Sequence, residues 1–344
     1  MFRTLVLLAA AVALSLGASA QSANVLPDLD GDPVVLVVHG GAGTITRAAM
    51  TPETDAAIRA SLAEALRAGH AVVMAGGDAL DAVDAAITIM EDDPNFNAGR
   101  GGVFAADQTV RHDASIMDGA TGLAGASSGT MHVRHPIRLA RRVMDASPHV
   151  LLSGDGAEEF AMQQGLEMVP NTYFHTPSRL DGLLRVQERE RSTTGLAVPS
   201  PDAWQMHGTV GAVALSAEGT LAAGTSTGGM TNKRWGRIGD APIIGAGTFA
   251  DGTVGISATG HGEFFIRLGV ARDVAARMAY LGEDVDTAAS TVIGTTLTEA
   301  GGTGGIIVLD AQGNASMPFN TEGMYRGAIT RSGVVTTLIY GDEE

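Results

Sequence analysis

The chain has 344 residues, with 38 acidic and 22 basic side chains and a formal net charge of −16. An acidic surface repels phosphate backbones, so the composition excludes nucleic acid as a partner. The absence of cysteine excludes thiol catalysis and disulfide bonds, and 45% hydrophobic residues suffice for the core of one or two domains.

Residues 1–20 have the layout of a secretory signal peptide. One positive charge, Arg3, precedes an apolar run over 5–16, and small residues around Ala20 form a cleavage site. The run is shorter than the roughly 18 residues that a membrane span needs. We therefore expect an exported protein, periplasmic or secreted, with no membrane contact once this leader is removed.

Apolar periodicity predicts both helices and strands in the rest of the chain. A buried strand over 34–38 leads into a glycine-rich loop over 39–43. Helices are expected where apolar residues recur every three or four positions, namely 53–68, Asp78 to the residue before Pro94, 136–144, 156–164, 264–281 and 284–293. Further strands are expected at 210–215, 221–225, 254–258, 305–309 and 334–340. Between about 170 and 208 the chain is polar and lacks periodicity, which indicates a flexible surface segment.

Thr209 lies where this polar segment meets a predicted strand, directly after Gly208. If the bond between them is cut, Thr209 gains a free α-amine, with a pKa of about 7.7–8.0, that can act as the base for its own hydroxyl. Loops before strands are common, so the junction alone does not establish such a cut. It does predict that one residue carries both nucleophile and base.

A predicted hairpin places a second hydroxyl beside Thr209. The strands 210–215 and 221–225 flank a short turn around Glu218, so paired residues have numbers that sum to 436. Thr209 then faces Thr227, with their Cβ atoms about 5 Å apart. Opposed threonines are also ordinary features of sheets, so this pairing supports a site without proving one.

Several motifs together resemble the plant-type asparaginases, also called isoaspartyl peptidases, which are N-terminal nucleophile hydrolases. The motifs occur in order along the chain at 39–43, 91–99, 113–119, 209–215, 224–229, 236–242 and 259–263. The resemblance implies an α+β fold, a four-layer αββα sandwich with two packed antiparallel sheets between helices. It also implies self-cleavage of one domain into an α subunit, 21–208, and a β subunit, 209–344, which assemble as a dimer of αβ pairs.

The resemblance assigns roles to residues at matching positions. Thr209 attacks the side-chain carbonyl of asparagine, or the β-linked carbonyl of an isoaspartyl dipeptide, to form an acyl-enzyme, and Thr227 hydrogen-bonds near it. Thr259, through its hydroxyl, and Gly260, through its N–H, would stabilise the oxyanion.

The same resemblance gives partners for the charged ends of a small-molecule substrate. Arg237 matches the residue that binds the α-carboxylate, and Asp240 matches the one that binds the α-ammonium; from spacing alone, the two form an ordinary ion pair. Gly260 and Gly262 also line the substrate site, and Asn97 and Gly41 support the nucleophile. The resemblance implies no cofactor except a structural sodium ion, held by backbone carbonyls of Glu91, Asp92, Asp93 and Phe96.

Three alternatives compete with this interpretation. Glycosylasparaginases belong to the same family but usually carry Asn after the second threonine, where this chain has Gly228. The run 125–129 fits the G-x-S-x-G elbow of an α/β-hydrolase esterase with Ser127 as nucleophile, although the flanking strand and helix are missing. A non-catalytic exported binding protein would use the glycines to line a cleft. One departure from the family is Gly208, where many relatives have Asp, and it leaves the rate of self-cleavage open.

Overall fold

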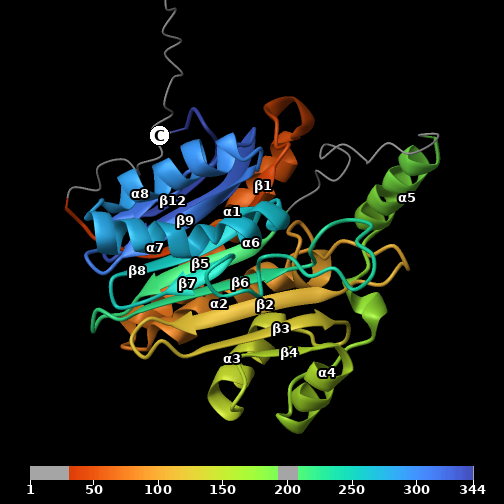
Figure 1. Cartoon of the computed structure of the whole chain (residues 1–344), viewed down its shortest axis with the longest axis horizontal. Coiled ribbons are helices and arrows are strands. Elements are labelled where there is room, and N and C mark those ends of the chain that lie inside the picture. Colours follow the sequence, from red (N-terminus) through yellow and green to blue (C-terminus); the bar gives the residue numbers. More distant parts are fainter. Residues whose placement is uncertain (1–30, 193–207, 344) are drawn as a thin grey trace, which may run out of the picture.

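The computed structural model describes residues 31–192 and 208–343, and the predicted leader lies outside these ranges. They form two β-sheets packed face to face, with helices on both outer sides (Figure 1). This is the α+β sandwich of four layers that the resemblance implies. None of the helices within the described ranges is long and apolar enough to cross a membrane.

The larger sheet has eight strands, and β1, β5 and β6 lie at its centre. Their order across the sheet is β12 (Val335–Tyr340), β11 (Gly323–Thr330), β1 (Val34–Gly43), β5 (Val210–Leu215), β6 (Leu221–Thr227), β2 (His112–Asp118), β3 (Ala124–Thr130) and β4 (Leu151–Ser153). All neighbours are antiparallel except β3 and β4, which are parallel. The expectation of two antiparallel sheets is therefore confirmed, with one parallel pair at this edge.

The smaller sheet has four strands and covers one face of the larger one. Its order is β10 (Ala315–Ser316), β9 (Gly304–Asp310), β8 (Val254–Gly260) and β7 (Thr248–Ala250). A core of buried side chains fills the space between the sheets, with Val213, Ile256 and Val308 among them. This core fixes the end of β8 over the start of β5.

The helices cover the outer faces of both sheets. α1 (Pro52–Met74), α2 (Ala79–Asp92) and α3 (Pro136–Ala146) pack on the larger sheet, followed by α4 (Gly154–Gln163) at its β4 edge. α6 (Gly262–Leu268), α7 (Val270–Leu281), α8 (Val285–Thr291) and the π-helical η5 (Val292–Leu297) lie on the side of the smaller sheet. The short 3-10 helices are η1 (Arg47–Ala49), η2 (Gly99–Gly101) and η3 (Asn171–Phe174).

Three expectations about local structure are wrong. The glycines at 39–43 continue β1, with a bulge between His39 and Gly41, instead of forming a loop. The helix expected over 264–281 breaks at Gly269, whose φ of 62° separates α6 from α7. The polar stretch after 170 contains η3 and α5 (Pro177–Ser192), which extends at one end of the molecule (Figure 1).

Candidate active site

Thr209 immediately precedes β5 and faces β6 in the predicted register. Val210 pairs with Ser226, and Gly211 pairs with Thr225, so the paired numbers sum to 436. The Thr209 hydroxyl donates a hydrogen bond to the Thr227 hydroxyl, with 3.1 Å between the oxygens. The hairpin prediction, made from turn length and strand pattern, is confirmed.

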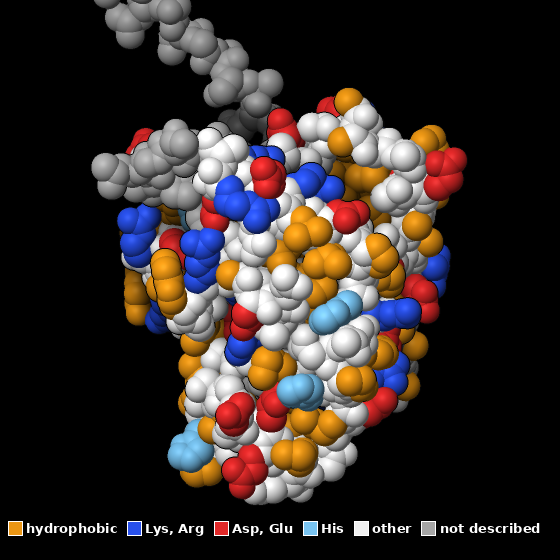
Figure 2. Space-filling view, turned by 90° about the vertical axis from the view of Figure 1, so that its right-hand side faces the viewer, with side chains coloured by type: hydrophobic (Ala, Val, Ile, Leu, Met, Phe, Trp, Pro, Cys, Tyr) orange, Lys and Arg blue, Asp and Glu red, His pale blue; other side chains and the backbone are white. Residues whose placement is uncertain are grey.

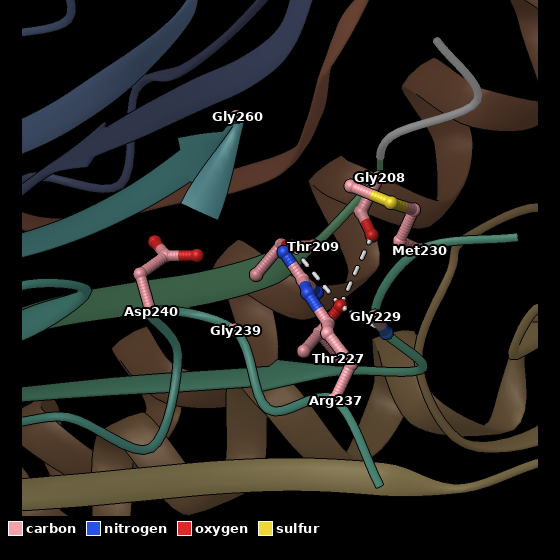
Figure 3. Close-up of a pocket in the computed structure, with 9 residues that line it drawn as sticks. All are labelled: Gly208, Thr209, Thr227, Gly229, Met230, Arg237, Gly239, Asp240 and Gly260. Carbon is pink, nitrogen blue, oxygen red and sulfur yellow. Dashed lines mark hydrogen bonds between the residues drawn. The ribbon is translucent and has the colours of Figure 1, made fainter. Parts of the chain in front are cut away.

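The Thr227 hydroxyl contacts both sides of the peptide bond that joins Gly208 to Thr209. It accepts hydrogen bonds from the Thr209 hydroxyl and from the Gly229 N–H, the latter at 2.9 Å. Its own hydrogen points to the Gly208 carbonyl oxygen, 3.3 Å away, as the dashed lines in Figure 3 show. One hydroxyl therefore connects the nucleophile to the carbonyl that the nucleophile would attack in self-cleavage.

His39 on β1 fixes the backbone of Thr209, a contact that the sequence did not predict. Its Nδ1–H donates to the Thr209 carbonyl oxygen at 2.8 Å, and its Nε2 accepts from the Ser257 hydroxyl at 2.9 Å. Complete burial lowers the pKa of His39 to about 3, so the ring is neutral and keeps this tautomer. The His-Gly-Gly motif marked this segment as part of a family motif, but neither its spacing nor its apolar pattern indicated that His39 binds Thr209.

Gly41 and Asn97 both pack against Gly208. Gly41 has a φ of +119°, and a Cβ added there would lie 2.6 Å from the Gly208 Cα, so only glycine fits beside this peptide bond. The Asn97 amide donates to the Gly229 carbonyl at 2.7 Å and accepts from the Val103 N–H at 2.9 Å. Asn97 thus ties the loop after α2 to the turn that follows β6.

Thr259 and Gly260 end β8 above the start of β5. The Thr259 hydroxyl accepts a hydrogen bond from the Ala42 N–H at 3.3 Å, which leaves its own hydrogen to donate elsewhere. Thr259 is fully buried, whereas Gly260 lines the pocket next to Thr209. Gly260 is thus the one of the two that the structure places at the pocket surface.

Arg237 forms a two-pronged ion pair with Glu263 at the N-terminus of α6. Its Nε and Nη2 each donate to one Glu263 oxygen at 2.9 Å. Burial opposes the charge on Arg237, but the Glu263 carboxylate outweighs it and raises the pKa of the guanidinium. Gly262 lies beside this group, because a Cβ there would be 2.9 Å from Nη2 of Arg237 and 2.7 Å from Oδ1 of Asp240.

Asp240 is a buried carboxylate at the pocket. Its Oδ2 has no hydrogen-bond partner among the described residues, although it is shielded from solvent. Burial raises the pKa of Asp240 to about 7, and the nearby Arg237 charge only partly opposes this shift. A buried carboxylate oxygen without a partner is costly unless a proton or a ligand satisfies it, so Asp240 could accept a hydrogen bond from a cationic group in the pocket.

Lys233 is a second group that the sequence did not single out. It is only 5% exposed, and its ammonium donates to the carbonyl oxygens of Gly228 and Arg111 at 2.7 and 2.6 Å. Burial lowers its pKa to about 8. The Lys233 ammonium therefore stabilises the turn after Thr227 through its hydrogen bond to the Gly228 carbonyl.

The segment proposed to hold sodium presents backbone carbonyls around two glycines. A Cβ on Gly99 would lie 2.2 Å from the Glu91 carbonyl oxygen, and one on Gly101 would lie 2.0 Å from that of Phe96. The carboxylates of Asp92 and Asp93 point to other partners, including Arg134 and Asn95. Among the residues that the structure covers, no cluster of three or more acidic or histidine side chains could hold a metal ion. Backbone carbonyls are therefore the groups here that would hold a hard cation, if one binds.

A pocket brings many of the predicted site residues together (Figure 3), but its lining does not include Thr259, Gly262, Asn97 or Gly41. Its lining consists of Gly208, Thr209, Thr227, Gly229, Met230, Arg237, Gly239, Asp240 and Gly260. The free volume of about 10 Å³ has room for about one water molecule while Gly208 is in place. A nucleophile with a hydroxyl partner, a guanidinium and a carboxylate thus face one small space, and this arrangement suits an amino acid with a reactive side-chain carbonyl.

Comparison with protein families matches residues 32–339 to the family described as "Asparaginase". The chain belongs to the asparaginase family. It is 44% identical over 310 residues to an isoaspartyl peptidase of Escherichia coli strain K12, covering 90% of this chain and 97% of the relative. It is also 40% identical over 326 residues to a probable isoaspartyl peptidase/L-asparaginase 2 of Arabidopsis thaliana, covering 89% and 98%.

Another relative is an isoaspartyl peptidase of Salmonella typhimurium, 45% identical over 307 residues that cover 89% of this chain and 98% of that protein.

The structure rules out the esterase alternative, in which Ser127 would be the nucleophile. Ser127 lies in the middle of β3, fully buried and paired with Ala114 on one side and Leu152 on the other. A nucleophile elbow needs a sharp, exposed strand-to-helix turn, which is absent at this serine.

Proposed function

We propose that this protein is an amidohydrolase that cleaves L-asparagine and β-aspartyl dipeptides through an acyl-enzyme on Thr209. The observation that carries the proposal is the convergence of Thr209, Arg237 and Asp240 on one pocket. The guanidinium can pair with the α-carboxylate of the substrate, and the unpartnered Asp240 oxygen can accept from its α-ammonium. This pairing leaves the side-chain carbonyl of the substrate for Thr209.

We propose that the chain first cuts itself between Gly208 and Thr209. The Thr209 hydroxyl attacks the Gly208 carbonyl, while Thr227 donates a hydrogen bond to the carbonyl oxygen that becomes negative. The C–N bond then breaks as the Thr209 nitrogen takes the proton that the hydroxyl gave up, and an ester forms between Gly208 and the Thr209 oxygen. Water hydrolyses this ester to give a Gly208 carboxylate and a free Thr209 amine. Departure of Gly208 also enlarges the pocket that it lines.

Turnover uses the same hydroxyl on a new carbonyl. The Thr209 amine takes the hydroxyl proton as the oxygen attacks, and the Gly260 N–H and the Thr259 hydroxyl stabilise the oxyanion. Collapse expels ammonia, or the amine of a dipeptide, which receives that proton. Water then hydrolyses the acyl-enzyme, releasing aspartate and restoring Thr209.

The space around Gly228 favours these substrates over glycosylated asparagine. A Cβ at this position would lie 2.5 Å from the Asn97 Oδ1 and 2.7 Å from the Gly102 Cα. The asparagine that glycosylasparaginases usually carry there would therefore displace Asn97. The relatives compared above are named for isoaspartyl peptides and asparagine.

Several features of the working protein are proposed on sequence grounds. Residues 1–20 would direct export and be removed, leaving α and β subunits over 21–208 and 209–344. Assembly into a dimer of αβ pairs rests on the family resemblance. The carbonyls of Glu91 and Phe96 fit a structural sodium ion, which would stiffen the loop that carries Asn97.

Mass spectrometry of the purified protein, with assays on both substrates, tests the proposal. We expect a fragment that begins at Thr209 and release of ammonia from asparagine and of free amino acid from a β-aspartyl dipeptide. Thr209→Ala should stay a single chain and hydrolyse neither substrate. An intact, inactive wild-type chain would instead favour a binding protein, and two chains in Thr209→Ala would refute self-cleavage.

A further inference from the structure

One stripe of α5 contacts the two loops that frame the pocket. The inward residues of α5 are Arg179, Leu183, Gln187 and Glu190, spaced by four, four and three positions. This spacing places them on one face of a helix. α5 is the last element that the structure describes before Gly208, and it stands at the edge of the molecule seen in Figure 1.

The first part of the stripe binds the loop that carries Asn97. The Arg179 guanidinium donates to the carbonyl oxygens of Gly101 at 2.8 Å and Asn95 at 3.2 Å. Leu183 is buried against Phe104, in a small cluster separate from the main core. Arg179 and Leu183 thus fix α5 to the loop after α2.

The second part of the stripe binds the segment before Arg237. Asn232 is fully buried, with a φ of 64°. The oxygen and the nitrogen of its side-chain amide each form a hydrogen bond with a residue of α5. Its Oδ1 accepts from Gln187 at 3.2 Å, and its Nδ2 donates to Glu190 at 3.0 Å. Glu190 also pairs with Arg234 through its other oxygen.

Arg234 connects this anchor to the substrate-binding guanidinium. Its carbonyl oxygen accepts a hydrogen bond from the Arg237 N–H at 2.9 Å, which closes a tight turn. Trp235 at that turn has a φ of 55° and is 97% exposed, so side-chain packing contributes little to holding the turn. Among the side-chain contacts described for this segment, the anchor on α5 is therefore the tertiary one closest in sequence before Arg237.

We propose that α5 positions the arm of Arg237 and Asp240, with Glu190 as the positioning residue. This inference rests on the proposed function, because it assigns the substrate's charged ends to that arm. None of the described α5 contacts involves the bond between Gly208 and Thr209, so cutting that bond removes none of them. Basic, acidic and hydrophobic side chains are interspersed on the face shown in Figure 2.

The test compares Glu190→Ala with Glu188→Ala, a matched change on the same helix. Glu188 is 71% exposed and pairs only with Arg191 in the described contacts, whereas Glu190 is 19% exposed and binds the arm. Loss of the ion pair with Arg234 and of the hydrogen bond from the Asn232 amide should raise the KM for asparagine about five- to tenfold in Glu190→Ala. kcat should stay within about twofold, since none of the described α5 hydrogen bonds involves Thr209 or Thr227.

Two further measurements separate positioning from general loss of stability. Glu190→Gln keeps an oxygen acceptor for the arm and should bring KM back to within about threefold of wild type. Hydrogen–deuterium exchange should quicken over 230–240 in Glu190→Ala alone. This measurement needs no activity, so it still decides the inference if the wild type hydrolyses neither substrate.

The inference is overturned if Glu190→Ala and Glu188→Ala have the same KM at 25 °C, whatever their melting temperatures. It is also overturned if exchange over 230–240 is unchanged in Glu190→Ala. A fall in kcat with unchanged KM would likewise contradict it, because the arm would then affect the chemical step and not substrate binding. An inactive wild type refutes the proposed function alone.

Discussion

Thr227→Val tests the central hydroxyl of the site with little change in shape. Valine keeps the branched Cβ that suits β6 and replaces the hydroxyl by a methyl group. Three hydrogen bonds disappear together: one from Thr209, one from the Gly229 N–H and one to the Gly208 carbonyl. The variant therefore removes the only described side-chain hydrogen bond to the Gly208 carbonyl, which belongs to the peptide bond that is cut.

The size of the effect follows from these contacts. Removing one preorganised donor to a developing oxyanion costs about 10²- to 10³-fold in rate. The lost contact to Thr209 weakens the orientation of the nucleophile in both reactions. We expect self-cleavage at least about 100-fold slower, and a similar loss of kcat in whatever fraction is cut. The unpaired Gly229 N–H adds a stability cost of about 1–3 kcal/mol.

The assay follows the intact mass and the denaturing-gel pattern of freshly purified protein over time. Thr330→Val is the matched control: Thr330 is a buried threonine on β11 whose hydroxyl bonds to the Val334 N–H, far from the pocket in the fold. It should lose stability but cut itself at the wild-type rate. Cleavage of Thr227→Val within about threefold of that rate would refute the role given to this hydroxyl.

Three more predictions address the substrate. Arg237→Ala should be processed normally, because no described Arg237 contact reaches the bond that is cut. Its KM for asparagine should rise about 100-fold or more, because the substrate loses a bidentate charge pair. Steady-state kinetics measures this rise, and an unchanged KM contradicts it. Asp240, with its pKa raised to about 7, is mostly protonated at pH 6 and ionised at pH 8, so KM should fall about tenfold across that range. Asp240→Asn should abolish this fall, whereas a persistent pH dependence of KM would point to another group. Gly228→Ala should push Asn97 away and lower kcat at least about tenfold, because overpacking costs about 1–3 kcal/mol. Turnover by the processed enzyme measures this loss, and a wild-type kcat would show that the turn adapts to the methyl group.

The β5–β6 hairpin was predictable because its register depends on local signals. A short turn around Glu218 with Gly219 at a φ of 82° leaves few ways to pair the strands. By contrast, β2 and β3 escaped detection because they are rich in Ala, Ser, Gly and Asp, which lack strand preference. β2 forms by pairing with β6, and β3 forms by pairing with β2 and β4. Pairing with β6 and β4 and burial between layers are contacts that a local pattern does not reveal.

α5 was missed for a similar reason. Its sequence is polar and contains Gly182, and one buried leucine gives no periodic signal. Its stability comes from Arg179, Gln187 and Glu190 binding backbone and side-chain groups more than forty positions away in sequence. Polar partners of this kind leave no trace in an apolar pattern.

The residues of the site came from motifs, but their geometry did not. Spacing alone favours an ion pair between Arg237 and Asp240, yet Arg237 pairs with Glu263 and leaves an Asp240 oxygen unpartnered. His39 and Lys233 act through backbone carbonyls, which every residue possesses. The sequence therefore identifies the side chains that carry out chemistry better than it identifies the contacts that position them.

Gly208 lines the pocket of the uncut chain, so under the proposed self-cleavage the uncut chain would be a zymogen that one of its own residues keeps closed. The proposed activating step is intramolecular, so its half-time is independent of protein concentration. Freshly made enzyme should therefore show a first-order lag before hydrolysis begins, the same in dilute and concentrated samples. A cell that exports the chain during that lag would keep its internal asparagine out of reach of the enzyme.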